Sequence, residues 1–511
     1  MSRTYNTIRN SFWGLIYKAI TLIAPFIIRT IIIKELGIEY LGLSSLFTSI
    51  LQVLSLTELG FSSAIVFSMY KPISEKNHKK IRALMNFYKN AYRNIGLIIL
   101  VIGIGVIPFL NKLISGGYPE TINIYFLYIL YLSNTVISYF LYAYKIALLN
   151  ANQRQDIISN VLSIVTLIQY VMQVLVLVVY KNYYVYYIFT PIISIIYNLI
   201  IARITNKKYP EYYSEGKLEK EDKEDIKKRV TGLMIGKICG TTRNTFDSII
   251  ISSFLGLSMV AIYQNYYYIM SNIAGVLTVF ITAMSASVGN SVASESIDKN
   301  YRDFNRMTFL YAWISGWCTV CLLCLYQTFM KIWVGESLMF SNNIVIILAI
   351  YFFVLTSGDI RSVYMNAKGL WWENRYRTIL ESLSNLILNI ILVRFFGISG
   401  VILATVISLV LFNFFMSSNV LFAHYFIKKK KSKYFLSYLK YTLVTLLACF
   451  ITYIITNIVN FTEYEIINLI VKLIICIIVP NLIFILIYKN DENYKESKTM
   501  VVNLFNKILK R

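Results

Sequence analysis

Charge is scarce in this 511-residue chain: Asp, Glu, Lys and Arg make up 15% of it, whereas soluble domains carry about 25%. Long stretches without any charge recur from one end of the sequence to the other. A water-exposed surface could not tolerate such stretches, so a soluble multidomain protein is excluded. The apolar residues, at 57% of the chain, instead predict a polytopic membrane protein.

Histidine is scarce too, with only His78 and His424 in the whole chain. A His-based catalytic triad or a zinc site would need more than these two. The three cysteines within 318–324 lack a fourth metal ligand, and the glycine motif at 232–237 is one residue short of a phosphate-binding loop. We therefore expect no enzyme, no metal site and no other cofactor.

The chain does contain many apolar runs of the length, about 20 residues, that a helix needs to cross a bilayer. These runs predict an all-α integral membrane protein with about fourteen transmembrane helices. The predicted spans are 12–34, 41–69, 95–111, 121–144, 157–180, 183–202, 231–254, 258–290, 307–330, 342–366, 378–396, 398–426, 441–460 and 465–488.

Basic residues gather in alternate loops. With the N-terminus inside, the loops and tails predicted to be cytoplasmic hold 38 Lys and Arg, whereas the outer loops hold five. The positive-inside rule then predicts that both termini are cytoplasmic. The segment 81–92 and the tail around 501–509 have apolar stripes flanked by bases, which is typical of helices lying on anionic lipids. The net charge of +23 therefore indicates contact with the membrane surface and not nucleic-acid binding.

A short echo links the two halves of the chain. RTIII followed by Leu-Gly at 29–37 is matched by DSIII followed by Leu-Gly at 247–256. Together with the span count, the echo predicts two six-helix bundles that form a pseudo-two-fold repeat along the membrane normal, plus two C-terminal helices. The predicted organisation is an N-terminal six-helix bundle at 1–202, a charged cytoplasmic linker at 203–230, a C-terminal six-helix bundle at 231–426, a basic cytoplasmic loop at 427–440, two extra transmembrane helices at 441–488 and a cytoplasmic amphipathic tail at 489–511.

Ionisable side chains inside the spans are the candidate site. A charge at the centre of a transmembrane helix costs about 2.5–3.5 kcal/mol on insertion scales, so it usually faces a cavity or a partner. Bases in a water-filled cavity would attract a phosphate or diphosphate. Alternatively, the charges pair between helices and only fix the packing; for Lys472 we favour snorkelling to an interface. The predicted cavity bases are Arg29, Lys237, Arg243, Arg361 and Lys18, and the predicted cavity acids, which are also candidates for ion coupling, are Glu58, Asp247 and Asp359.

Four stretches resemble the bacterial polysaccharide-biosynthesis flippases of the capsule, O-antigen and teichoic type. They are 29–72, 247–269, KIWVGE at 331–336 and FFGISGVILATVIS at 395–408. The resemblance runs over essentially the whole chain, and it implies the multidrug/oligosaccharidyl-lipid/polysaccharide exporter fold, with two bundles round a central cavity. It also implies an undecaprenyl-diphosphate-linked oligosaccharide as substrate. This would be moved from the inner to the outer leaflet of the bacterial cytoplasmic membrane by alternating access, alongside other polysaccharide assembly proteins.

Two other functions stay open. A multidrug exporter of the same fold, coupled to H⁺ or Na⁺, would want acidic cavity residues, and Lys18 and Arg29 in the first span disfavour it. A membrane polysaccharide polymerase would need a large charged outer loop, and no predicted outer loop exceeds about a dozen residues.

Overall fold

The computed structural model describes residues 3–58, 60–458 and 464–499, except for the side chains of 3–12, 57, 232, 233, 235–239, 244, 283 and 286. Regular structure in this part of the chain is helical throughout. The chain divides into two compact units, residues 1–261 (unit 1) and 262–511 (unit 2). The predicted domain boundaries at 202 and 231 stay predictions.

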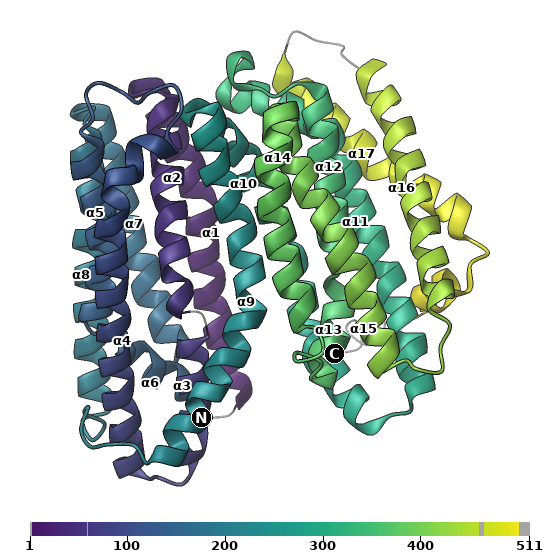
Figure 1. Ribbon diagram of the computed structural model, residues 1–511. Coiled ribbons are helices and arrows are strands. Elements are labelled where there is room, and N and C mark those ends of the chain that lie inside the picture. Colours follow the sequence, from purple (N-terminus) through teal and green to yellow (C-terminus); the bar gives the residue numbers. More distant parts are fainter. Residues whose placement is uncertain (1–2, 59, 459–463, 500–511) are drawn as a thin grey trace. The chain divides into compact units, whose positions relative to one another are not determined.

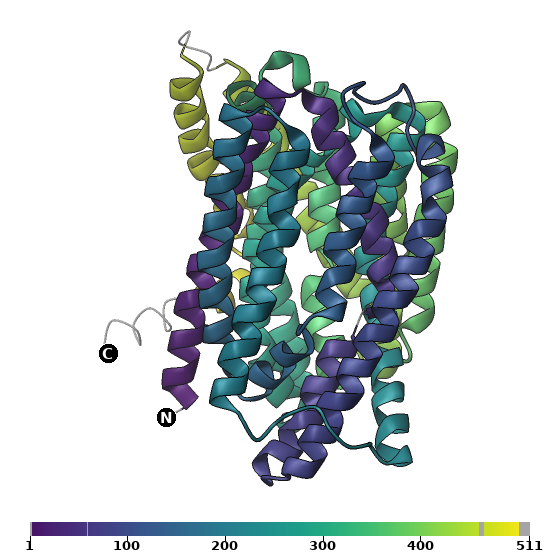
Figure 2. The same cartoon turned by 90° about the vertical axis from the view of Figure 1, so that its left-hand side faces the viewer.

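Unit 1 is a bundle of long helices that run side by side in both views (Figure 1 and Figure 2). The apolar faces of its helices pack against one another and form a shared core, which contains mainly Leu, Ile and Tyr side chains. Its helices are α1 (Arg3–Glu35), α2 (Ile38–Leu54), η1 (Ser55–Glu58), α3 (Phe61–Ser74), α4 (His78–Val106), η2 (Ile107–Leu113), α5 (Ile124–Phe140), α6 (Tyr144–Ala151), α7 (Gln155–Val179), α8 (Tyr183–Lys208) and α9 (Lys220–Leu255).

Unit 2 begins within α10 (Leu257–Ser294), and α11 is the helix against which its last two helices pack. A shared core joins aromatic and cysteine side chains of α11, α16 and α17. The remaining helices are α11 (Ile297–Val334), η3 (Glu336–Leu338), α12 (Asn342–Thr356), α13 (Asp359–Lys368), α14 (Arg375–Ser408), the π-helix η4 (Leu409–Met416), α15 (Ser417–His424), α16 (Lys431–Ile458) and α17 (Glu465–Tyr488).

The outer faces of the helices are apolar, as expected for a membrane protein. Large apolar side chains are exposed along their outer faces, for example Val179 at 67% and Leu486 at 64%, which only hydrocarbon would solvate without cost. Among the described residues, nine helical segments are long and apolar enough to span a membrane, or up to eleven if each of two bent pairs is one span. The predicted all-α membrane class is confirmed, and the count of fourteen stays a prediction.

The repeated Leu-Gly motif forms the same local joint twice. Gly37 separates α1 from α2 with φ +114° and ψ 160°, and Gly256 separates α9 from α10 with φ +87° and ψ 173°. This region of backbone space is essentially open only to glycine. The echo therefore reflects a real similarity of the two helix junctions, while the pseudo-two-fold repeat stays a prediction.

The structure places the segment 81–92 differently from the prediction that it lies on the lipid surface. It lies within α4, and its apolar stripe is buried in the core of unit 1, with Ile81, Met85 and Tyr88 almost inaccessible. The interpretation as a helix lying on the lipid surface is therefore wrong, because other helices of unit 1 cover the stripe; the ring of Phe61 on α3, for example, stacks on that of Tyr88. The similar tail at 501–509 lies outside the described residues.

The predicted charged linker at 203–230 is mostly helical, since α8 ends at Lys208 and α9 begins at Lys220. The residues between them, 209–219, are here called the strap. Arg82 of α4 donates from Nε to the carbonyl oxygen of Glu211 (2.7 Å) and from Nη1 to the hydroxyl of Tyr213 (2.6 Å). Asn86, one turn further along α4, donates to the carbonyl oxygen of Gly216 (2.8 Å). The strap is thus held against α4.

Candidate functional site

The predicted span 41–69 is interrupted at Glu58. The helix α2 ends at Leu54, a 3₁₀ turn follows, and Gly60 takes a left-handed conformation with φ +88° before α3 begins. This break turns the carboxylate of Glu58 toward α4 and α5, where Tyr92 and Tyr139 each donate a hydroxyl hydrogen bond to it. The carboxylate is therefore held inside unit 1 by two phenols, neither of which the sequence reasoning had connected with it.

The two predicted bases of α1 differ in their surroundings. Lys18 is exposed, whereas Arg29, eleven residues later, is partly buried. Arg29 is thus a base, on a helix long and apolar enough to cross a membrane, whose side chain is not fully buried.

The helix α9 presents a polar face to the rest of unit 1. Asp247 is fully buried, and Thr245 beside it donates to the side-chain oxygen of Gln52 on α2 (3.3 Å). Arg243, one turn before Asp247, is only partly buried. The side chain of Lys237 lies outside the described residues. Because α2 contacts both α1 and α9, Arg29 and Arg243 come from two helices that share a neighbour.

Arg361 has different surroundings, in unit 2. Its side chain is 1% exposed. One terminal nitrogen donates to the hydroxyl of Tyr434 (2.8 Å), and the other donates to the carbonyl oxygen (2.6 Å) and side-chain oxygen (3.0 Å) of Asn413. The ring of Phe414 lies 5.3 Å from its guanidinium carbon. In this conformation the guanidinium holds α13, η4 and α16 together.

Asp359 begins α13, directly after the break at 357–358 that ends α12. Tyr311 of α11 donates its hydroxyl to the Asp359 carboxylate. Tyr438 of α16 donates to the carbonyl oxygen of Ser357 (2.5 Å), so the break is fixed from two sides. Asp359 and Arg361 therefore share a polar region of unit 2, and the sequence did not indicate that Tyr311 and Tyr438 belong to it.

The surroundings of Lys472 differ from those that the sequence predicted. It is 8% exposed, and its Nζ donates to the hydroxyl of Thr328 (3.1 Å). The interpretation that it snorkels to an interface is wrong, because α11 covers it and supplies that hydrogen-bond acceptor.

The comparisons with known proteins agree on one fold. A family model described as "Polysaccharide biosynthesis protein" matches residues 7–285, more than half of the chain. Three solved structures are similar as well. The lipid II flippase MurJ, in an inward closed conformation, has a TM-score of 0.66 at 18% identity, covering 95% of this chain and 99% of its own. A multidrug resistance MATE family transporter of the MOP superfamily, inward-facing, has 0.58 at 12%, covering 79% and 97%.

A MOP superfamily transporter from Pyrococcus furiosus has a TM-score of 0.54 at 15% identity, covering 83% of this chain and 96% of its own. No curated protein matches the sequence. The structural likenesses, all at low identity, show the fold, and the family model shows the family that the four stretches of sequence predicted. The chain therefore belongs to the polysaccharide biosynthesis protein family, and it has the fold of the MOP superfamily transporters.

Proposed function

We propose that the protein is a membrane flippase that moves an undecaprenyl-diphosphate-linked oligosaccharide from the inner to the outer leaflet of the cytoplasmic membrane by alternating access. The family match over 7–285 is the observation that carries the proposal. The membrane helices with exposed apolar faces and the similarity of the fold to a lipid II flippase support it further.

Arg29 and Arg243 are the residues that we assign to the diphosphate. Arg29 lies on α1, whose segment Trp13–Glu35 is long and apolar enough to cross a membrane, and Arg243 lies on α9, within the predicted span 231–254. Both side chains are only partly buried. An arginine can bind a phosphate through two parallel N–H donors, which a lysine cannot. Lys18, which is exposed, and Lys237 would add attractive positive charge. Arg361 was predicted to belong with them, but its nearly complete burial favours a packing role in unit 2.

The acids are candidates for coupling transport to H⁺ or Na⁺. Glu58 and Asp359 are each hydrogen-bonded by tyrosine hydroxyls, and Asp247 is buried in α9. A proton or cation arriving at such a carboxylate would change its hydrogen bonds, which is how a local charge can bias a two-state element.

A cation-coupled multidrug exporter is the second candidate, because a MATE family transporter has a similar fold. Such an exporter would bind fluorescent organic cations in a direct titration of the purified protein. We expect no saturable binding, since Lys18 and Arg29 on α1 would repel a cation.

Deletion of the gene followed by analysis of lipid-linked glycans tests the proposed function. We expect a full-length repeat unit to accumulate in the inner leaflet and surface polysaccharide to disappear. Complementation with Arg29→Ala or Arg243→Ala should fail at normal expression, whereas Arg93→Ala, which removes an exposed arginine of α4, should restore export. Restored export with both Arg29→Ala and Arg243→Ala would overturn the assignment of these residues, and unaltered lipid-linked glycans in the deletion strain would overturn the proposed function.

A further inference from the structure

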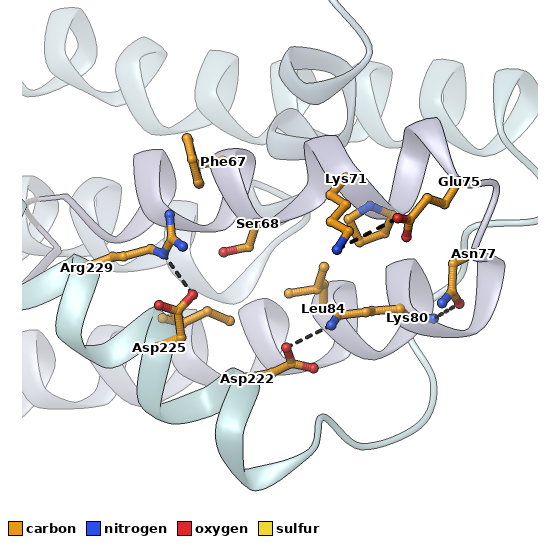
Figure 3. Close-up of a pocket in the computed structure, with 12 residues that line it drawn as sticks. Phe67, Ser68, Lys71, Glu75, Asn77, Lys80, Leu84, Asp222, Asp225 and Arg229 are labelled. Carbon is orange, nitrogen blue, oxygen red and sulfur yellow. Dashed lines mark hydrogen bonds and ion pairs between the residues drawn. The ribbon is translucent and has the colours of Figure 1, made fainter.

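Unit 1 contains a pocket of about 380 Å³ where α3 ends and α4 and α9 begin (Figure 3). The volume lies in the range of small-molecule sites, which is roughly 300–1,000 Å³. Its apolar floor includes Pro72, Leu84 and Ile226, all buried. None of the eight residues predicted from the sequence as cavity bases or acids lines it, so it is a separate feature of the molecule.

Three bases and three acids surround this floor, so the lining has no formal net charge. Each helix contributes a base, and the positions 222, 225, 226 and 229 lie on one face of α9 because their spacing follows the helical repeat. The charged lining residues are Lys71 and Glu75 of α3, Lys80 of α4, and Asp222, Asp225 and Arg229 of α9.

The ion pairs around the pocket are of unequal strength. Lys80 contacts Asp222 at 2.8 Å, and Arg229 contacts Asp225 at 2.8 Å through Nε. By contrast, Lys71 lies 3.9 Å from Glu75, and its side chain is 84% exposed. Exposed pairs of this kind contribute little to stability, so a ligand could displace the Lys71 pair at little cost.

Each of the stronger pairs leaves capacity for a ligand. The hydrogen bond of Arg229 to Asp225 uses Nε and one carboxylate oxygen, while the bond from Lys80 to Asp222 uses one oxygen of that carboxylate. A guanidinium has five N–H donors and a carboxylate has two acceptor oxygens. The pocket can therefore offer N–H donors from Arg229 and Lys71 to an anion, and carboxylate oxygens from Asp222 and Asp225 to a cation.

The surroundings of the pocket suit a lipid. Phe67 of α3 lines it, lies 4.5 Å beneath the guanidinium of Arg229 and packs edge to face with Tyr70, and both rings are about half exposed. Aromatic rings are enriched at the level of the lipid head groups, and these two exposed rings lie next to the charged lining of the pocket. Acyl chains attached to a ligand in the pocket could thus continue along the exposed face of α3.

We propose that this pocket binds the head group of a zwitterionic phospholipid that carries a phosphate and a primary ammonium, as phosphatidylethanolamine does. Lys71 and Arg229 bind the phosphate, and Asp222 and Asp225 accept hydrogen bonds from the ammonium. A lining without net charge favours such a head group over a purely anionic one, because an anion alone would leave the acids of the pocket facing it. The site is independent of the proposed transport activity.

Titration of the purified full-length protein in detergent tests the proposal, with binding followed by calorimetry. The probes are short-chain phosphatidylethanolamine, phosphatidylcholine and phosphatidylglycerol. We expect the ethanolamine lipid to bind at least about tenfold more tightly, the change in affinity that one charge-assisted hydrogen bond confers. The trimethylated choline has no N–H to donate, and the glycerol head group has no cation. Equal affinity for all three lipids would overturn the proposal.

Two pairs of variants connect that preference to the pocket. Lys71→Gln and Asp225→Asn should each weaken binding of the ethanolamine lipid about tenfold, the loss of one charge-assisted hydrogen bond. Lys79→Gln and Glu224→Gln, which change exposed neighbours that do not line the pocket, should leave it unchanged. Lys71→Gln removes an exposed, weakly paired side chain, so it should fold normally. Equal binding by Lys71→Gln and the wild type, or equal losses in the control variants, would contradict the assignment.

Soluble glycerophosphoethanolamine distinguishes the two sources of this chemistry. If the soluble compound competes with the lipid at similar concentrations, the pocket also accepts free phosphate esters. If only the lipid binds, the acyl chains contribute and the ligand is a membrane lipid. Either result supports recognition of a phosphate joined to an ammonium. If inorganic phosphate binds as tightly as the lipid and as glycerophosphoethanolamine, the proposal is overturned.

Discussion

Arg361 donates a hydrogen bond of 2.6 Å to the backbone carbonyl of Asn413, which lies inside the π-helix η4. A π-helix changes the regular hydrogen-bond ladder, and such irregular backbone is tolerated at membrane depth only where protein groups satisfy it. The same guanidinium also binds Tyr434 of α16. One buried cation thus fixes an irregular helix and one of the last two helices of the chain.

The first prediction concerns that buried cation. Arg361→Ala should destabilise the protein by at least about 1.5–3 kcal/mol, because it removes the hydrogen bonds of a buried charged group to Tyr434 and Asn413. The thermal unfolding midpoint in detergent would report the loss, and Arg29→Ala should shift it far less because Arg29 is only partly buried. An Arg361→Ala protein of normal stability that has lost transport would instead assign Arg361 to the substrate.

Close backbone approach gives a second prediction. A Cβ atom added at Gly42 of α2 would lie 2.2 Å from the carbonyl oxygen of Leu257. Backbone atoms cannot move away as a side chain can, so Gly42→Ala should cost at least about 1–3 kcal/mol, the usual cost of overpacking. Gly105→Ala is the matched control, since no atom lies within 4 Å of that position on α4. Equal unfolding midpoints for the two variants would show that α2 and the start of α10 do not meet this closely.

The pair of tyrosines on Glu58 provides a third prediction. Tyr92→Phe and Tyr139→Phe should each remove one hydrogen bond to the carboxylate, at a cost of about 1.5–3 kcal/mol each. Combined with Glu58→Gln in double-mutant cycles, both tyrosines should show coupling to Glu58, because the effects of contacting residues are not additive. Strictly additive unfolding free energies would mean that the carboxylate does not accept these hydrogen bonds.

The strap gives a fourth prediction. Arg82→Ala removes two hydrogen bonds to residues 209–219 and a guanidinium that lies 4.0 Å from the Tyr213 ring. We expect faster amide exchange and faster protease cleavage within the strap, since local protection depends on such contacts. Lys79→Ala, which changes an exposed residue on the same helix, should alter neither rate. Unchanged exchange in the Arg82→Ala protein would show that the strap is held by other contacts.

The sequence predicted the class of fold because that class follows from composition and local pattern. Apolar runs need no partner to be recognised, and the Leu-Gly motif at 37 and 256 marks two helix joints through the conformations open to glycine. The same local reasoning failed for 81–92, because an amphipathic stripe looks alike whether a lipid surface or another helix covers it. Burial in the core distinguishes the two cases, and it depends on tertiary structure.

The partners of the predicted charges could not be read from the sequence for a similar reason. Tyr92 and Tyr139 lie 34 and 81 positions from Glu58, and only the fold brings them together. Arg361 and Lys472 were recognised as intramembrane bases, yet their burial is set by Asn413 and Thr328 on other helices. Sequence therefore identified which residues carry charge in the membrane, but not which of them stay accessible to a ligand.

Transport by the purified protein tests the central claim most directly. The protein would be reconstituted into vesicles with a fluorescent undecaprenyl-diphosphate-linked oligosaccharide, and the lipid that reaches the opposite leaflet would be measured by its accessibility to a membrane-impermeant quencher. We predict rapid translocation by the wild type and by Arg93→Ala, and loss of translocation in Arg29→Ala and Arg243→Ala with normal folding. Wild-type vesicles that move the lipid no faster than protein-free vesicles would contradict the account.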